Sequence, residues 1–438
     1  MVAPAAPSLP EVNSSVSISR SPHYWRRLLG FIGPGFMISV GYMDPGNWAT
    51  DIAGGSRFGY TLLFVIMASN LMAILLQNLS LKLGVATERD LAQMCHECYG
   101  PKVSFALWVF AEIAIAACDL AEVIGSAIAL ELLFHIPLFY GVLITGLDVL
   151  LILLLQRWGF RYIEALVIAL IGTITVLFGI QIVLSRPEYG LALRGLVMPS
   201  SGILTNHGML YIAIGMLGAT VMPHNLYLHS SIVQSRQYKR TPEGKREAIH
   251  LAGVDSALAL MLALFVNAAI LIVAAAVFHR SGYFDVAAIQ DAYKLLSPLV
   301  GAAGASTLFA VALLASGQNS SITGTLAGQI VMEGFIRIKL SPWLRRLITR
   351  SLAIIPTIIV VAVTGERGTE KLLILSQVIL SLQLSFAVFP LVMFTSDKAK
   401  MGEFVNPTWL KVMAYTVAAV IATLNVWLLV QTVGAWIR

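Results

Sequence analysis

Apolar segments long enough to cross a lipid bilayer recur along the whole of this 438-residue chain. Backbone polar groups in lipid must be hydrogen-bonded within the protein, so segments of this length are predicted to be helices. Hydrophobic residues make up 58% of the chain and charged residues only 12%, which excludes an ordinary soluble protein. The sequence therefore predicts an all-α integral membrane protein with eleven transmembrane helices, roughly at 28–53, 60–86, 103–133, 138–155, 163–184, 207–234, 251–279, 299–335, 343–363, 371–395 and 409–435.

The distribution of lysine and arginine predicts how these helices are oriented. Most of the 29 basic residues fall in the N-terminal tail and in alternate connections, which places those segments in the cytoplasm and the C-terminus outside. This topology accounts for the net charge of +6 without a nucleic-acid partner. Residues 1–22 are rich in Pro, Ser and Ala, and we predict that they form a disordered cytoplasmic tail.

Two of the apolar segments are interrupted by a proline that stands among polar residues. One carries Asp-Pro-Gly-Asn at 44–47 and the other Met-Pro-His-Asn at 222–225. Each proline breaks its helix and frees the carbonyl four residues earlier, which belongs to Gly41 in the first segment and to Ala219 in the second. A broken helix at membrane depth is tolerated only where it lines a cavity. Because a carboxylate there costs about 3 kcal/mol or more without a partner, we expect Asp44 to be functional.

Broken helices at corresponding positions indicate a transporter made of two repeats, with its site where the breaks meet. The first repeat is predicted over about 28–184 and the second over about 207–395, with the helix at 409–435 as an addition. Each repeat holds five helices, an odd number, so the second is inverted relative to the first. Together these elements predict one transporter domain over residues 23–438.

The expected site offers a carboxylate, a side-chain amide, a freed carbonyl and a thioether. They come from Asp44, Asn47, Ala219 and Met222. Oxygen ligands alone would suit Mg²⁺ or Ca²⁺, whereas the sulfur of Met222 shifts the preference toward Mn²⁺, Fe²⁺, Co²⁺ or Cd²⁺. Gln377 could add an amide to the metal or to its waters. The competing interpretations are that Met222 only packs and that Asp44 only caps a helix.

Three acids lie in the apolar segment 103–133, namely Glu112, Asp119 and Glu122. Their spacings of 7 and 3 place them within an arc of roughly 80° on one face of a helix. Aligned acids inside a membrane commonly relay protons. We therefore interpret Asp119 and Glu122 as a proton pathway.

Other side chains could exchange protons or support the acids. His224 and His229 have the side chains most ready to titrate near neutral pH, although each could equally be a hydrogen-bonded structural residue. Arg345 and Arg346 begin the segment at 343–363, where either could pair with one of the acids or simply anchor the cytoplasmic side.

Rival functions are tested against the same residues. The Cys95–Cys98 pair has no second pair to complete a zinc site, and no protease, hydrolase, ATPase or dinucleotide motif is present, so we expect neither an enzyme nor a cofactor. A metalloenzyme built on His224 and His229 is disfavoured because five residues place them about 140° apart on a helix. A cation-coupled amino-acid or organic-solute transporter remains the main alternative, although Asp44 would repel a substrate carboxylate. A passive metal channel also remains open.

Three stretches carry a resemblance to a known family. They are the motif at 44–47, the motif at 222–225 with Leu-Tyr-Leu-His-Ser after it, and the segment 317–335 with its Gly, Ser, Thr and Gln residues. In these the chain resembles the natural resistance-associated macrophage protein (Nramp) family of proton-coupled divalent metal transporters, whose bacterial members are manganese transporters of the MntH type. The likeness spans residues 28–435.

This resemblance implies a leucine-transporter-like fold and an importer of divalent transition metals. It implies that the metal is bound by Asp44, Asn47, the Ala219 carbonyl and Met222, with Gln377 able to join them. It assigns proton movement to Asp119, Glu122, His224, an arginine matching Arg346 and, more distantly, Glu112. A count of eleven helices is similar to that of bacterial members, so we expect a protein of the inner membrane. We expect it to act as a monomer on metal and protons, without a bound cofactor.

Overall fold

The computed structural model describes residues 7–18, 21–146, 159–286, 288–302, 304–337, 342–364 and 367–437. These residues form helices joined by short connections, without a β-sheet among them; one isolated parallel bridge joins Val16 and Arg236. The first half contains α1 (Tyr24–Phe31), α2 (Pro34–Gly41), α3 (Pro45–Phe58), η1 (Gly59–Leu62), α4 (Leu63–Thr87), α5 (Leu91–Cys98), α6 (Pro101–Phe134), α7 (Leu138–Thr145), α9 (Phe160–Ser185), α10 (Tyr189–Val197) and α11 (Gly202–Thr205). The second half contains α12 (His207–Thr220), α13 (Pro223–Ile232), η2 (Val233–Ser235), α14 (Pro242–Val277), η3 (His279–Ser281), α15 (Ile289–Val300), α16 (Ala305–Ile336), α17 (Pro342–Thr364), α18 (Arg367–Ser396), α19 (Lys398–Met401), η4 (Gly402–Phe404) and α20 (Thr408–Ile437).

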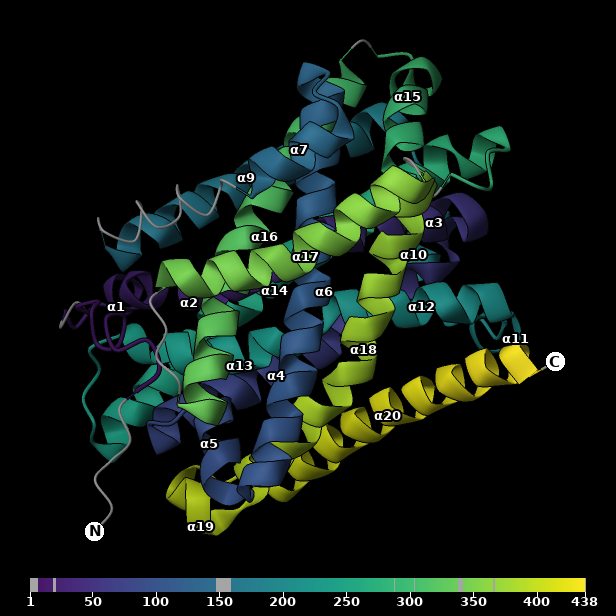
Figure 1. The fold of residues 1–438 in the computed structure, drawn as a ribbon. Coiled ribbons are helices and arrows are strands. Elements are labelled where there is room, and N and C mark those ends of the chain that lie inside the picture. The colour runs from purple at the N-terminus through teal and green to yellow at the C-terminus, as the bar shows by residue number, and fades with distance from the viewer. Residues whose placement is uncertain are drawn as a thin grey trace.

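Long helices cross the molecule side by side and confirm the all-α membrane architecture (Figure 1). Within the described residues, seven helical stretches are long and apolar enough to span a bilayer. The count of eleven spans stays a prediction. The predicted segment at 138–155 begins with α7, and its remainder from 147 on lies outside the described residues.

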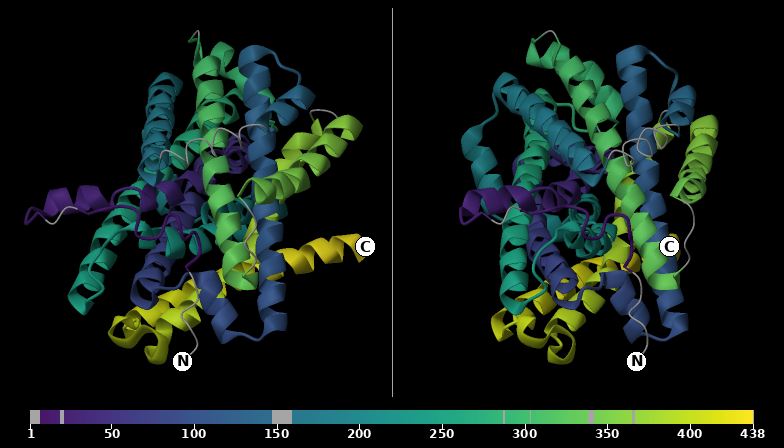
Figure 2. Two further views of the ribbon diagram at one scale, coloured as in Figure 1. Left: turned by 60° about the vertical axis from the view of Figure 1, so that its left-hand side comes forward. Right: turned by 90° about the vertical axis from the view of Figure 1, so that its left-hand side faces the viewer.

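The hydrophobic core surrounds the first broken helix. Trp48 of α3 is fully buried, and its ring packs edge-on against Phe178 of α9 and Phe309 of α16, at centroid distances of 4.9 and 5.1 Å. The helix α16 packs most extensively against α6. The half-helices therefore sit inside a cage of longer helices, whose arrangement around them is visible from two further sides in Figure 2.

The first break lies between α2 and α3, at Tyr42, Met43 and the capping residue of α3. Its backbone carbonyls would be costly in a membrane without partners. The Asn267 side chain donates to the Tyr42 carbonyl at 2.7 Å, while the Trp48 indole and the Ser316 hydroxyl donate to that of Met43. Side chains from α3, α14 and α16 thus stabilise the unwound segment, and Asn267 has the structural role expected of a buried amide.

The second break lies between α12 and α13. The backbone is non-helical at Val221 and extended at Met222, and α13 begins with Pro223. A proline is well tolerated at this first helical position because its missing N–H would have had no partner within the helix. Both breaks therefore fall at the proline-containing motifs 44–47 and 222–225, where the sequence predicts them.

The N-terminal end of α2 is held by a buried cluster of charges, which we call the α2 anchor. Asp255 of α14 accepts hydrogen bonds from the amides of Gly33 and Gly35 at 3.3 and 2.7 Å. Arg236 is completely buried, donates to the Ile32 carbonyl at 2.9 Å and pairs with Glu164 of α9 at 2.7 Å. These contacts satisfy the first amides of α2 and connect it to α9, α14 and the end of α13.

Part of the tail predicted to be disordered over residues 1–22 packs on the protein, while residues 1–6 and 19–20 lie outside the described residues. Residues 7–18 lie against the protein, and the side chains of Leu9, Val12 and Val16 are buried at 1%, 8% and 5% exposure. Their spacing of three and four residues gives this short segment an apolar face, which its Pro, Ser and Ala content obscured in the sequence. We call residues 7–18 the N-terminal strap.

Candidate metal centre

The two helix breaks meet at the side chain of Asn47. Its amide nitrogen donates to Asp44 Oδ1 at 2.7 Å and to the carbonyls of Gly41 and Ala219, each at 3.2 Å. Gly41 and Ala219 are the two residues whose carbonyls the prolines were predicted to free. The breaks therefore bring the loose ends of both half-helix pairs to one point in the interior.

Asp44 uses one of its oxygens to begin α3. Oδ1 accepts from the Asn47 backbone amide at 2.8 Å, which is an N-cap. Oδ2 is buried without a hydrogen-bond partner among the described residues. Asp44 therefore does cap a helix, but the cap uses only one carboxylate oxygen and leaves the other available for a cation.

Met222 and Gln377 complete the lining of this point. The Met222 sulfur lies 3.0 Å from where a Cβ would stand on Gly41, and a Cβ on Gly46 would overlap the Gln377 amide. Both side chains are fully buried. Gln377 Nε2 donates to Ser376, whereas its Oε1 has no partner among the described residues. Only glycine at 46 lets α18 bring this amide against the start of α3.

The donor set suits a divalent cation in the place that the Asn47 nitrogen now takes. That nitrogen carries partial positive charge among three oxygens, and a half-turn of the amide would present its oxygen to an ion instead. Asp44 supplies negative charge, Ala219 a carbonyl, and Met222 a polarisable sulfur. Within the described residues there is no group of three or more His, Cys, Asp or Glu side chains that could hold a metal. A zinc-enzyme type of centre is therefore not found there.

The acids of α6 lie beside this centre. Asp119 and Glu122 are 4% and 1% exposed, and a Cβ placed on Gly324 of α16 would be 3.1 Å from an oxygen of each. The two carboxylates therefore face the same glycine. Cys118 connects them to the centre, because it packs against Met222 and its sulfur lies 3.6 Å from Glu122 Oε1.

Glu112 stands apart from these two acids. It is partly exposed and accepts a hydrogen bond from the Trp108 indole at 3.1 Å, one turn earlier on α6. Asp119 and Glu122 thus form the buried pair against Gly324, and a common role with Glu112 stays a prediction. The candidate Arg346 belongs to α17, and its side chain lies outside the described part of the chain.

The two histidines of α13 have different environments. His224 is 1% exposed, and neither ring nitrogen has a partner among the described residues. His229 is also buried, and its Nδ1 is 2.9 Å from Gln77 Oε1, while the Gln77 nitrogen donates to the Tyr42 hydroxyl at 2.8 Å. His229 thus matches the structural alternative, and His224 remains the histidine beside the centre.

Sequence reasoning missed the α2 anchor. Glu164 and Asp255 are acids inside the apolar segments 163–184 and 251–279, so they carried the same signal as the acids of α6. Arg236 falls in the basic connection between the predicted helices 207–234 and 251–279, where a solvent-exposed side chain is expected, whereas in the structure it is buried. Only the folded chain shows that Arg236 pairs with Glu164 and that Asp255 bonds the first amides of α2.

The fold and the centre together define a multi-pass membrane transporter of the leucine-transporter fold. Mhp1, a nucleobase-cation-symport-1 family transporter, shares this fold with a TM-score of 0.60 at 12% identity, over 92% of this chain and 93% of that one. The family model described as natural resistance-associated macrophage protein-like matches residues 35–431, and the chain belongs to this Nramp family. Members of the family are metal transporters and not enzymes, as predicted.

Two relatives show how close the likeness is. The divalent metal cation transporter MntH of Nostoc sp. is 64% identical over 431 residues, which cover 98% of this chain and 97% of that protein. The crystal structure of the Eremococcus coleocola manganese transporter has a TM-score of 0.89 and 45% identity, over 96% of this chain and 90% of that one. The predicted family and the predicted fold class are both confirmed.

Proposed function

We propose that this chain is a secondary-active symporter that imports Mn²⁺, and also Fe²⁺, Co²⁺ and Cd²⁺, together with protons. Its relatives in Nostoc and Eremococcus are named as a divalent metal cation transporter and a manganese transporter, which supports this substrate class. The distribution of basic residues supports an inner-membrane protein with a cytoplasmic N-terminus and an external C-terminus. We propose that a monomer is sufficient, because both broken helices belong to the same chain.

The observation that carries the proposal is the meeting of both breaks at Asn47. One carboxylate, two amides, two carbonyls and one thioether surround a single point, and all are buried. Burying an unpartnered carboxylate oxygen at Asp44 is costly unless it binds a cation for part of the cycle. Met222 distinguishes this donor set from the all-oxygen sets that Mg²⁺ and Ca²⁺ prefer.

Protons are proposed to move through the neighbouring acids. A metal ligand must be deprotonated, so the proton that leaves Asp44 on metal binding passes to Asp119 and Glu122. Cys118 shares a buried apolar cluster with Met222, and its sulfur lies 3.6 Å from Glu122 Oε1, so α6 lies next to the centre, which supports this pathway. His224, buried and without a ring partner among the described residues, is the nearby side chain best suited to receive a proton.

We propose that the two repeats, about 28–184 and 207–395, supply the moving parts. In transporters of this kind, one bundle rocks against the other around a fixed site at the repeat interface. The pairs α2–α3 and α12–α13 occupy equivalent positions at that site. Their unwound segments provide hinges, and the long helices α6 and α16 provide the surface against which they close.

The test measures Mn²⁺ uptake into proteoliposomes with Ca²⁺ and Mg²⁺ in large excess. The native protein is compared with Met222→Ala and with the matched control Met216→Ala, which removes an equally buried methionine of α12 that packs in a purely apolar cluster. We expect Mn²⁺ selectivity to collapse in the first variant and to persist in the second.

Each outcome bears on a different part of the proposal. Equal loss of selectivity in both methionine variants would mean that packing, and not the Met222 sulfur, sets the preference. Absence of any Mn²⁺ uptake by the native protein, together with sodium-dependent uptake of an amino acid, would replace the metal transporter by the organic-solute alternative.

A further inference from the structure

The N-terminal strap is bonded to the end of the second broken helix. Its Ser14 and Val16 amides donate to the carbonyls of Gln234 and Ser235, each at 2.9 Å, and the Gln237 amide donates back to the Val16 carbonyl at 2.9 Å. These are the contacts of the parallel bridge between Val16 and Arg236. Because η2 continues α13 directly, the strap is fastened to the segment that follows the metal centre.

The other end of the strap is bonded to α16. The Leu9 amide donates to Glu333 Oε2 at 3.0 Å, and Gln329 Nε2 contacts Glu11 Oε1 at 3.4 Å. Gln329 also donates to Glu333 Oε1 at 3.0 Å, so one amide holds both carboxylates. The strap therefore connects the end of α13 to α16, the long helix against which α13 packs.

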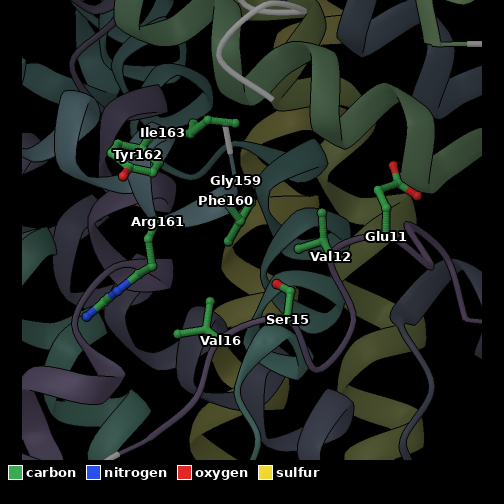
Figure 3. A pocket seen from close by; sticks show the side chains of 9 residues that line it. All are labelled: Glu11, Val12, Ser15, Val16, Gly159, Phe160, Arg161, Tyr162 and Ile163. Atoms are coloured by element: carbon green, nitrogen blue, oxygen red, sulfur yellow. The ribbon is translucent and has the colours of Figure 1, made fainter. Parts of the chain in front are cut away.

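The strap also contacts α1 and faces the start of α9. A Cβ on Gly30 of α1 would be 2.6 Å from Ile18 Cγ2, so the strap reaches this helix at van der Waals contact. On its other side, Val12, Ser15 and Val16 face residues 159–163 at the start of α9, across a cavity of about 280 Å³ (Figure 3). In Figure 1 the strap, coloured purple, lies close to α1.

The residues at the interface between the strap and the rest of the protein are shielded from water. Asp90, which begins α5, is 1% exposed, and burial raises its pKa to about 6, helped by the nearby charge of Glu333. Leu9 and Val16 are buried to a similar degree. Detachment of the strap would expose its own apolar face and the surfaces of α5 and α16 that it covers.

We propose that the N-terminal strap is a cytoplasmic latch that ties α13 and α1 to α16 and so favours the inward-closed conformation. In the proposed cycle, opening toward the cytoplasm separates these elements; the strap is hydrogen-bonded to η2 after α13 and to α16, and it is in van der Waals contact with α1. Strap contacts must therefore break before metal can leave on that side. The strap adds a control of release rate to the proposed transport cycle, on which this inference rests.

The experiment uses Cys118 as a reporter of access to the centre. Cys118 is 1% exposed and packs against Met222, so a reagent reaches it only through an open pathway. With Cys95→Ala and Cys98→Ser as background, a membrane-impermeant maleimide is applied to the cytoplasmic face of inside-out vesicles. The release variant is Leu9→Asp with Val16→Asp. The matched control, Ser15→Asp with Ser17→Asp, adds the same charge at exposed strap positions.

We expect the release variant to label Cys118 several-fold faster than the native chain, and the control to label at the native rate. Val16→Pro, which removes the amide hydrogen that bonds the Ser235 carbonyl and keeps an apolar side chain of similar size, is expected to give a smaller increase and covers the case in which the double variant does not fold. Native labelling rates in Val16→Pro and in a folded release variant would overturn the latch.

Mn²⁺ binding, measured by calorimetry on the same proteins, separates the two proposals. If the native protein binds no Mn²⁺, the proposed function fails whatever the labelling rates are. If Mn²⁺ binds equally in all variants while the labelling rate does not respond to the strap, the transporter stands and the latch is wrong.

Discussion

Asp44 combines two roles through its two carboxylate oxygens. Oδ1 caps α3 through the Asn47 amide, and Oδ2 has no partner among the described residues. A cap can be neutral, since Asn caps helices as well as Asp does. A cation ligand at membrane depth gains from full negative charge. Substitutions at this single position can therefore separate helix stability from metal binding.

We expect Asp44→Asn to keep the melting temperature of the protein while Mn²⁺ affinity falls by more than about 100-fold, because even loss of an outer partner of a metal ligand costs 10–100-fold. Asp44→Ala should lose the affinity and also about 1 kcal/mol of stability with the cap. Calorimetric titration with Mn²⁺ and thermal unfolding in detergent measure the two effects. Full Mn²⁺ affinity in Asp44→Asn would remove Asp44 from the centre.

Single residues also show where the sequence stopped being informative. The proline positions were sufficient to predict that Gly41 and Ala219 lose their helical hydrogen bonds. The Asn47 amide stays a predicted metal ligand; that its nitrogen donates to both freed carbonyls is seen only in the structure. Which atoms meet across two helices depends on their relative rotation and depth, and neither can be read from spacing along one chain.

At the scale of helices, the half-helix α2 depends on charges that other helices supply. Its first amides are bonded by Asp255, and Gly33 adopts a φ of 146°, which favours glycine. A side chain there would also overlap Glu164 and Arg236. The breaks were predictable because proline acts locally, whereas the anchor was not, since its members come from segments far apart in the sequence.

We expect Glu164→Gln to destabilise the protein by about 3–5 kcal/mol, because it leaves Arg236 buried without its charge partner. The matched control is Glu247→Gln, which breaks the Arg27–Glu247 pair on the surface, where both side chains are more than a third exposed and an ion pair contributes about 1 kcal/mol or less. Thermal unfolding of both variants gives the comparison. Equal effects would show that the α2 anchor does not rely on charge neutralisation.

At the scale of the whole molecule, the proposed symport requires that the metal centre and the acids of α6 act together. In the proposed cycle, the strap and the α2 anchor help to close the centre on the cytoplasmic side. A passive channel would need no such closure, and it would stop at equal metal concentrations on both sides. A symporter can accumulate metal against its gradient when protons flow inward.

We expect proteoliposomes with an inward proton gradient to accumulate Mn²⁺ above the external concentration, and to lose this accumulation when a protonophore removes the gradient.

Gly324→Ala is the variant that tests the acids of α6 most directly, because its Cβ would stand 3.1 Å from an oxygen of both Asp119 and Glu122 without touching the metal donors. The methyl group must displace the two carboxylates, so gradient-driven accumulation should fall while Mn²⁺ exchange without a gradient continues. Gly172→Ala is the matched control, since a Cβ there meets nothing within 4 Å. Undiminished accumulation in Gly324→Ala would place the proton pathway elsewhere, and a native protein that only equilibrates Mn²⁺ would be a channel.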